Sequence, residues 1–292
     1  MQDTVELKAL AKINLGLDVL GRRQNGYHDV RMVMQTIYLY DNVTLYKTEE
    51  PGIKLETNLF YLPIDENNIA YKAAKMLMDE FDIQEGVRIV LDKHIPVAAG
   101  MAGGSSNAAA VLVGMNRLFA LGLNQEKLME RGVKLGADVP YCIMRGTVLA
   151  EGIGEILTPL PPLPKCYVLI AKPNISVSTQ MVYEKLDAQV IEQHPDIDGL
   201  LEGLEQQDIR KIASSMGNVL ELVTIGEYPI IEKIKQAMKD AGALNAMMSG
   251  SGPTVFGIFD DRKVAKEAQE KLKQMHIAKQ VYLANVHNTR RK

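Results

Sequence analysis

The sequence predicts an α+β protein of two domains, on three observations. Strand and helix patterns follow one another irregularly and do not repeat as βαβ units. A cluster of four prolines within positions 159–164 cannot continue a helix or a sheet, so we expect a domain boundary there. The length of 292 residues is enough to give each expected domain, 1–160 and 161–292, a hydrophobic core.

Composition excludes several classes of partner. With 33 Lys and Arg against 36 Asp and Glu, the chain has no overall positive field to hold a nucleic-acid backbone. Cys142 and Cys166 belong to no CxxC or Cys/His cluster, so neither a zinc site nor a disulfide framework is expected. No apolar run approaches the roughly 20 residues of a membrane span. We expect a cytoplasmic protein that binds neither nucleic acid nor membrane, and that ends in a solvated basic tail at 290–292.

The chain opens with a hairpin pattern. Apolar and polar residues alternate over 13–19 and again over 30–38, as in half-buried strands, and turn residues lie between the two runs. The alternation puts Lys12 and Asn14 on one polar face of the first strand, which we expect to be solvated.

Capping residues and apolar spacing predict the remaining elements. Up to the prolines these are a strand at 43–46 after an Asp41-Asn42 turn, a helix from an Asn68 cap to about 81, a strand at 87–91, a helix at 108–118 and one from 125 that ends at a left-handed Gly136. Beyond them are a strand at 167–171, a helix from 178 or 179, further helices up to 241, a strand at 254–259, a helix at about 262–275 and a strand at 281–286.

The most unusual segment joins the strand at 87–91 to the helix at 108–118. It contains three glycines and two serines, in Pro96-Val-Ala-Ala-Gly100-Met-Ala-Gly103-Gly104-Ser105-Ser106-Asn107. Glycines let backbone N–H groups approach a phosphate, and the positive end of the following helix favours an anion. No G-x-x-x-x-G-K-[ST], HRD or DFG sequence exists, which excludes a P-loop and a protein kinase. The segment predicts a polyphosphate site, and a tight packing turn is the alternative interpretation.

Phosphoryl transfer to a hydroxyl also needs a proton acceptor and a cation. Asp138 and Lys12 would supply them, although a turn aspartate and a surface lysine are the simpler interpretations. The glycine turn at 250–252 and the Gly26-Tyr27-His28 segment are weak indications alone, because each is equally typical of a strand end.

Six motifs in one order resemble those of the GHMP kinases, the family of galactose, homoserine, mevalonate and phosphomevalonate kinases, in which a glycine-serine loop replaces the P-loop. They are Ala11-Lys12-Ile13-Asn14, Gly26-Tyr27-His28, the loop at 96–107, Gly136-Ala137-Asp138-Val139-Pro140, Glu151-Gly152-Ile153-Gly154-Glu155 and Met248-Ser-Gly-Ser-Gly. Met101 replaces the family's usual leucine, a change that conserves volume. The resemblance implies an N-terminal domain like the second domain of ribosomal protein S5, a ferredoxin-like C-terminal domain and an active site between them.

The AKIN, GYH and GADVP motifs further imply the branch that uses ATP with Mg²⁺ to phosphorylate the 2-hydroxyl of a cytidine diphosphate methylerythritol, for non-mevalonate isoprenoid synthesis. Asp138 would be the base, and Lys12 would contact both it and the phosphate. The implied ATP site is Pro96, Gly100, Met101, Ala102, Gly103, Gly104, Ser105 and Ser106, with Asn67 and Lys93. The implied acceptor site is Asn14, Tyr27, His28, Thr179, Tyr183, Gly250, Ser251 and Gly252. No protein ligand for Mg²⁺ is predicted.

Two alternatives remain from the sequence. A homoserine or mevalonate kinase is disfavoured by the GYH segment, because neither substrate carries a base to stack. A non-catalytic sensor is disfavoured by Lys12 and Asp138, because a sensor needs no proton acceptor. The sequence predicts no oligomeric state.

Overall fold

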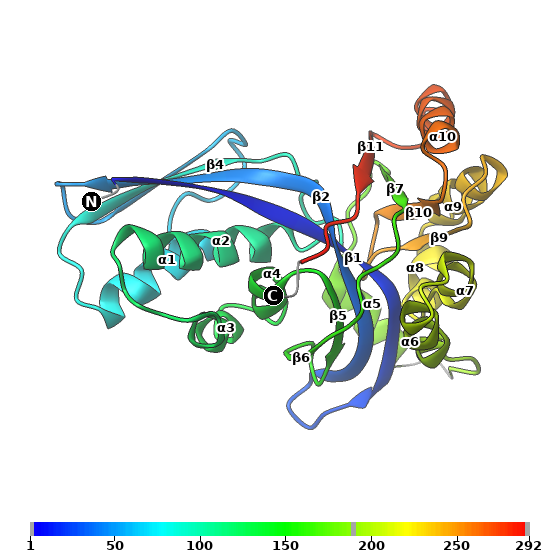
Figure 1. Cartoon of the computed structure of the whole chain (residues 1–292), viewed down its shortest axis with the longest axis horizontal. Helices are drawn as coiled ribbons and strands as arrows, with labels where there is room; N and C mark the ends of the chain where they lie inside the picture. Colours follow the sequence, from blue (N-terminus) through cyan, green and yellow to red (C-terminus); the bar gives the residue numbers. More distant parts are fainter. Residues whose placement is uncertain (1–2, 188–190, 290–292) are drawn as a thin grey trace. The chain divides into compact units, whose positions relative to one another are not determined.

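The computed structural model describes residues 3–187 and 191–289, so the predicted basic tail lies outside the described residues. Its strands are β1 (Thr4–Arg22), β2 (His28–Thr48), β3 (Ile53–Thr57), β4 (Gly86–Asp92), β5 (Thr147–Glu151), β6 (Ile156–Pro159), β7 (Tyr167–Lys172), β8 (Gly217–Asn218), β9 (Asn245–Met248), β10 (Val255–Phe259) and β11 (Gln280–Asn285). Its helices are α1 (Ile69–Glu80), α2 (Gly103–Leu118), α3 (Gln125–Val133), α4 (Val139–Met144), α5 (Thr179–Leu186), α6 (Ile197–Glu205), α7 (Ile209–Ser215), α8 (Glu221–Glu227), α9 (Ile230–Asp240) and α10 (Arg262–Gln274). The predicted α+β class is confirmed (Figure 1).

The chain forms two compact units, each discontinuous in sequence. Unit 1 comprises Met1–Ala11, Leu39–Val97 and Ala102–Met144, and unit 2 comprises Lys12–Tyr38, Ala98–Met101 and Arg145–Lys292. Strands β1 and β2 contribute residues to both units. The predicted domain boundary after residue 160 stays a prediction.

Unit 1 packs its helices on a short sheet. Strand β4 pairs in parallel with β3 and antiparallel with residues 42–48 of β2. Helix α2 packs against α1, α3 and α4, and it lies so close to β2 that a Cβ added at Gly114 would be 2.7 Å from Leu45 Cδ1. The Asn68 cap is confirmed, because its side chain accepts the N–H of Ala70 at 3.0 Å. The start of α2, where the glycine-serine segment lies, is therefore held by a rigid layer.

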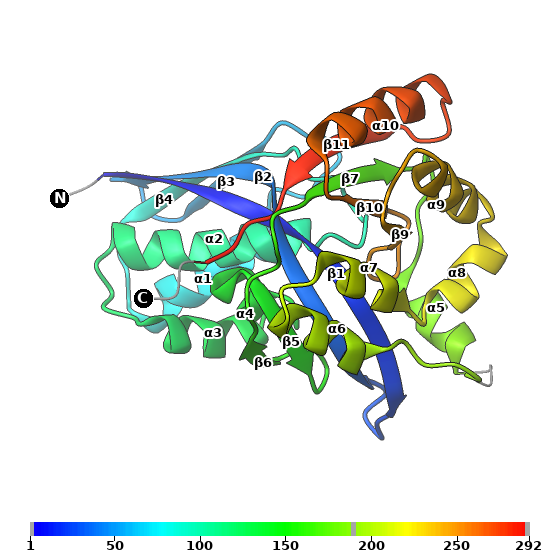
Figure 2. The ribbon, with the colours of Figure 1, turned by 45° about the vertical axis from the view of Figure 1, so that its right-hand side comes forward.

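Unit 2 contains a four-stranded antiparallel sheet in the order β11-β7-β10-β9. Helix α9 packs on β9 and β10, and α10 packs on β11 and β7 (Figure 2). Chain order and strand order together are those of a ferredoxin-like domain, as expected. Strand β9 was not predicted, because its short Asn-Ala-Met-Met sequence has no alternation and only its pairing with β10 makes it a strand.

Two predictions about the first two strands are wrong. Lys12 and Asn14 are not solvated, since they are 5% and 0% exposed within a run of β1 that is buried on both faces. The Asp41-Asn42 turn does not exist, because β2 continues through it. The Asp41 carboxylate is buried and accepts the backbone N–H groups of His94 and Ile95, so a distant strand end satisfies it in place of a local turn.

Two helix ends also differ from prediction. Helix α2 begins at Gly103 and not near Ala108, so the two serines lie in its first turn. Helix α3 ends at Val133, and Gly136 is not left-handed. The Gly136 carbonyl instead accepts the N–H of Val139 at 3.1 Å, in the turn that leads into α4.

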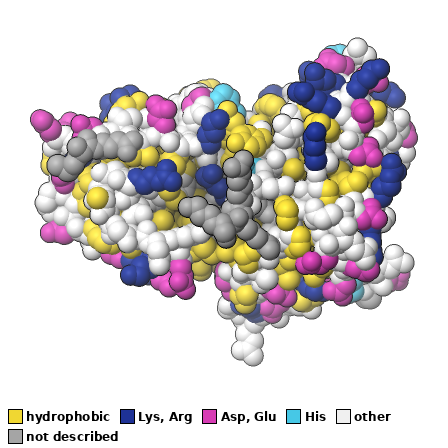
Figure 3. Space-filling model, viewed as in Figure 1, with side chains coloured by type: hydrophobic (Ala, Val, Ile, Leu, Met, Phe, Trp, Pro, Cys, Tyr) yellow, Lys and Arg dark blue, Asp and Glu magenta, His cyan; other side chains and the backbone are white. Residues whose placement is uncertain are grey.

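Charge on the described surface is mixed. Lys and Arg side chains gather over α10 in Figure 3, where Lys263 and Lys273 pair with Glu267 and Glu270 of the same helix. None of the helices within residues 3–187 and 191–289 combines the length and apolar content of a membrane span.

Candidate active site

The first glycine of the glycine-serine loop, Gly100, is fixed by the second glycine turn, at 248–252. Ser249 Oγ donates to the carbonyl oxygen of Gly100 at 2.9 Å. Gly100 has φ +70°, and a Cβ there would lie 2.0 Å from the Ser249 carbonyl oxygen. Packing alone therefore requires glycine at this position. The structure brings these two predicted motifs together within unit 2.

The rest of the loop forms the N-terminal turn of α2 in unit 1. The Ser106 hydroxyl is buried and donates to the Leu10 carbonyl oxygen at 2.7 Å, so its hydrogen bond is structural. Gly104 is exposed, and a Cβ there would only reach ordinary contact, 3.6 Å from Ile69 Cγ2. Protein packing does not require glycine at 104, whereas the close approach of a phosphate to the helix start would. Ser105 is half-buried beside it.

Lys12 lies against this loop. Its backbone N–H donates to the Met101 carbonyl oxygen at 3.2 Å. Its Nζ donates to Asn14 Oδ1 at 2.7 Å, so the predicted shared face of the two side chains is confirmed. A buried ammonium beside a neutral amide still lacks compensation for its charge, which favours an anionic ligand there.

Lys93 forms a buried cluster with two residues that sequence reasoning did not select. Its Nζ is ion-paired with Asp41 and donates to Asn107 Oδ1 at 2.7 Å. Asn107 Nδ2 donates to Asp41 Oδ2 at 2.9 Å, which closes the cluster. A Cβ at Gly103 would lie 3.4 Å from Lys93 Nζ, so this cation is next to the start of α2. Asp41 balances the Lys93 charge within the cluster, and the start of α2 itself favours an anion.

The predicted base-binding residues also lie together in unit 2. The rings of His28 and Tyr183 have centroids 4.8 Å apart and are tilted by 35°. His28 Nε2 lies 2.6 Å from Asp187 Oδ1, and Arg22 Nη1 lies 3.3 Å from Asp187 Oδ2. Tyr27 is 58% exposed, so its ring is available to a ligand. Asp187 was missed because 159 residues separate it from His28.

The turn at 250–252 is held by buried side chains. Asn218 Nδ2 donates to the carbonyl oxygens of Met248 and Gly250 at 2.9 and 2.8 Å. Glu221 accepts the Met248 N–H at 2.6 Å and a bond from Lys235 Nζ at 2.8 Å, and burial raises the pKa of the Glu221 carboxyl. The turn is thus rigid before any ligand binds.

Thr179 and Ser251, both predicted for the acceptor site, are in direct contact. Their hydroxyl oxygens lie 2.8 Å apart. Thr179 is the first residue of α5, which also carries Tyr183, so this contact joins the glycine turn to the aromatic pair within unit 2.

The other predicted residues lie in unit 1. Asp138 is half-buried and directly precedes α4, where its carbonyl accepts the Cys142 N–H at 3.0 Å. Pro96 is buried after β4. Asn67 is exposed and its amide donates to Asp65 Oδ1 at 3.0 Å. Across the described residues, no cluster of three or more His, Cys, Asp or Glu side chains has the arrangement of a metal site.

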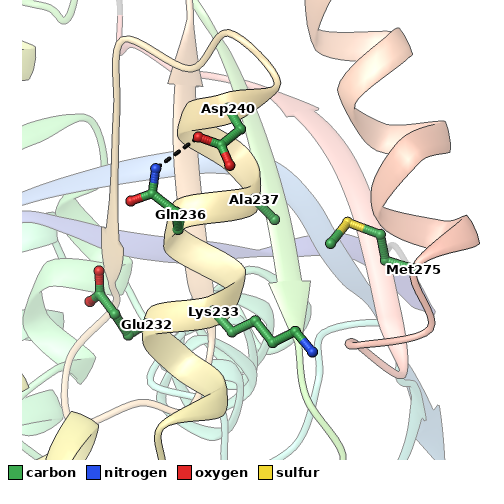
Figure 4. Close-up of a pocket in the computed structure, with 6 residues that line it drawn as sticks. All are labelled: Glu232, Lys233, Gln236, Ala237, Asp240 and Met275. Atoms are coloured by element: carbon green, nitrogen blue, oxygen red, sulfur yellow. Dashed lines mark hydrogen bonds between the residues drawn. The ribbon is translucent and has the colours of Figure 1, made fainter.

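A hollow of about 420 Å³ on α9 and the end of α10 contains none of the predicted residues (Figure 4). Its lining is Glu232, Lys233, Gln236, Ala237, Asp240 and Met275. In this hollow the Gln236 side chain donates a hydrogen bond to Asp240 Oδ1 at 2.8 Å, so these two polar side chains bond to each other. The hollow therefore does not contribute to the candidate active site.

Comparison with known proteins identifies full-length relatives. A 4-diphosphocytidyl-2-C-methyl-D-erythritol kinase from Lachnospira eligens is 57% identical over 280 residues, covering 96% of this chain and 97% of the relative. One from Clostridium perfringens is 50% identical over 285 residues, covering 98% and 99%. A crystal structure of a 4-(cytidine 5'-diphospho)-2C-methyl-D-erythritol kinase matches with a TM-score of 0.82 and 30% identity, covering 98% of this chain and 100% of that one.

Two sequence-family models define the class. Residues 68–146 match the model described as GHMP kinases N terminal domain, and residues 187–278 match the one described as GHMP kinases C terminal. The fold and the glycine-serine loop at a helix start are therefore those of a GHMP kinase. Within this class, the chain belongs to the family of the 4-diphosphocytidyl-2-C-methyl-D-erythritol kinases.

Proposed function

We propose that the chain transfers the γ-phosphoryl group of ATP, with Mg²⁺, to the 2-hydroxyl of 4-diphosphocytidyl-2-C-methyl-D-erythritol in non-mevalonate isoprenoid synthesis. The names of its full-length relatives support this acceptor. Cys142 and Cys166 are buried and neither forms a disulfide, which fits a reducing cytoplasm.

The observation that carries the proposal is the buried ammonium of Lys12, a residue whose backbone is bonded to the glycine-serine loop. Lys12 is 5% exposed, its Nζ is bonded to the neutral amide of Asn14, and its backbone is bonded to Met101. A charged group in such surroundings is stabilised when an anion binds. The phosphoryl group in transfer is that anion in this proposal, and Lys12 stabilises its charge.

The residues of the loop fit a triphosphate. The start of α2 offers backbone N–H groups, the Ser105 hydroxyl and the positive end of the helix dipole, and Gly104 leaves the approach open. Lys93, which is ion-paired with Asp41 and bonded to Asn107, places its ammonium next to Gly103. Mg²⁺ would be held mainly by the triphosphate oxygens and would neutralise their charge.

Asp138 is the proposed base. Its carboxylate accepts the proton of the acceptor hydroxyl as the new O–P bond forms, while the bond between the γ-phosphorus and the bridging oxygen of ADP breaks. The half-buried position before α4 supports this role, since the side chain is partly shielded and still reachable. Lys12 and Asp138 belong to different compact units, so their pairing at the hydroxyl is part of the proposal.

The acceptor's base would bind among the aromatic residues. Tyr27 is exposed, and Tyr183 already stacks near His28, which gives a cytosine ring two aromatic faces and a hydrogen-bonding partner. Homoserine and mevalonate offer nothing for this cluster to bind.

The test is ADP release by the purified chain with the cytidine acceptor, its uridine analogue, homoserine and mevalonate. We expect turnover with the cytidine acceptor, a kcat/KM lower by about 10²-fold or more with the uridine analogue, and none with the other two. Preferential turnover of homoserine or mevalonate would refute the acceptor. ATP binding with no ADP release from any acceptor would favour the sensor.

A further inference from the structure

Asp187 contacts the proposed base-binding histidine and lies just outside every predicted motif. It follows the last residue of α5, and its backbone N–H donates to the Tyr183 carbonyl oxygen at 3.0 Å. This bond fixes the carboxylate beside the His28–Tyr183 ring pair. The His28 side chain is 9% exposed and that of Asp187 is 26% exposed.

The proton in this contact has a definite place. A carboxylate only accepts hydrogen bonds, so at 2.6 Å the His28 Nε2 must carry the hydrogen and donate it to Asp187 Oδ1. Arg22 Nη1 lies 3.3 Å from Asp187 Oδ2 and so occupies the other carboxylate oxygen. When the His28 imidazole is neutral with its hydrogen on Nε2, its Nδ1 is unprotonated and accepts a hydrogen bond. No hydrogen bond to Nδ1 occurs within residues 3–187 and 191–289.

We propose that Asp187 is a specificity-determining positioning residue, which holds His28 in the tautomer that accepts a hydrogen bond from an exocyclic amino group on the base of the acceptor. This inference rests on the proposed function. Cytosine has an amino donor at the position where uracil has a carbonyl acceptor. An unprotonated Nδ1 accepts a hydrogen bond from the amino group of cytosine. With the uridine analogue, the same Nδ1 faces the uracil carbonyl oxygen, and these two buried acceptors cannot bond to each other.

Asp187→Asn tests this tautomer control. An asparagine amide both donates and accepts, so it can hold either tautomer of His28, and the Nδ1–H form suits uracil. We expect the ratio of kcat/KM for the cytidine acceptor to that for the uridine analogue to fall from about 10² or more to within about tenfold. Loss of structure alone would lower both values by the same factor and leave the ratio unchanged.

The control keeps the carboxylate and removes a charge elsewhere on the same helix. Lys185→Gln removes an ion pair with Glu227. It should retain the wild-type ratio. If Asp187→Asn also retains it while the wild type discriminates, the inference is wrong and the proposed function stands. A wild-type ratio near one refutes the recognition of cytosine itself.

A measurement on the wild type removes dependence on any variant's folding. Nitrogen NMR of the His28 ring, assigned by the loss of its signals in His28→Gln, should show Nε2 protonated and Nδ1 unprotonated near neutral pH. A ring with Nδ1 protonated would overturn the inference, whatever the kinetic result.

Discussion

Ser249 donates its hydroxyl hydrogen to the carbonyl oxygen of Gly100 across 149 positions of sequence. The bond fixes the beginning of the glycine-serine loop against the turn that Asn218 holds at Gly250. Because the Ser249 carbonyl oxygen fills the space where a Cβ of residue 100 would lie, Gly100 and Gly104 are glycines for different reasons.

Gly100→Ala should destabilise the protein by about 2 kcal/mol or more, since it adds a left-handed alanine and a backbone clash. Gly104→Ala should leave stability unchanged or slightly higher, because its Cβ meets only ordinary contacts in α2. It should instead raise the KM for ATP. Thermal unfolding and ATP titration of both variants test this difference. Equal unfolding temperatures for Gly100→Ala and Gly104→Ala would contradict the prediction.

Ser105→Ala and Ser106→Ala should separate ligand binding from stability. Ser106→Ala leaves the buried Leu10 carbonyl without its donor and should cost about 1 to 2 kcal/mol of unfolding free energy. Ser105→Ala should fold normally and bind ATP about 10-fold more weakly, with little change for the acceptor. Denaturant unfolding and titration of both ligands decide this. Equal weakening of ATP and acceptor by Ser105→Ala would mean that the serine only packs the loop.

Asp138→Asn should lower kcat by about 10²- to 10⁴-fold, because the amide cannot accept the hydroxyl proton. Fold and ATP affinity should persist, as the backbone bond from Cys142 to residue 138 does not use the side chain. Single-turnover kinetics with circular dichroism as the folding control test this. Activity within about twofold of wild type would remove Asp138 from the mechanism.

Ala102→Gly should stabilise the protein by about 1 kcal/mol. Ala102 caps α2 with φ 53° and ψ 32°, a left-handed conformation that costs a residue with a Cβ more than it costs glycine. Chemical denaturation measures the difference. Ala99→Gly in the same segment is the control, because Ala99 does not have a positive φ and should lose stability on the same change.

Cys166 should not react with thiol reagents in the folded protein. It is 2% exposed, and burial raises the pKa of its thiol from 9.0 to about 12. Only the unfolded chain loses this proton between those values, so the thiol's contribution makes stability fall as pH rises above 9. Cys166→Ala should reduce that alkaline loss. Labelling of the native protein as fast as in denaturant would refute this burial.

Features set by neighbouring residues were predicted well. The Asn68 cap and the helix starts at 125 and at 178 or 179 are confirmed, because a capping side chain that bonds an N–H two or three positions ahead is a local event. The shared face of Lys12 and Asn14 is confirmed for the same reason, since a strand's alternation fixes it.

Features set by distant residues were missed or misjudged. Alternation cannot show what covers a polar face, so the burial of Lys12 was not predicted. Asp41 precedes an asparagine and is typical of a turn, but its partner Lys93 lies 52 residues further along the chain. Asp187 needs a partner 159 residues away. Sequence patterns therefore predicted chemical groups for the candidate site but not the distant residues that contact them.

Within unit 2, strand β2 is hydrogen-bonded to the last segment that the structure describes. The Thr36 carbonyl accepts the His287 N–H at 2.8 Å, and the Gln35 side chain donates to the His287 carbonyl at 3.1 Å. This has a consequence during synthesis. Unit 1 has all its residues once position 144 has left the ribosome. Gln35 and Thr36 of β2 wait for these partners roughly 250 positions later, about 12 to 50 seconds at typical rates of translation. The nascent chain therefore lacks the last segment that bonds to β2 for most of its time on the ribosome, and we expect chaperones to bind this part of β2 there.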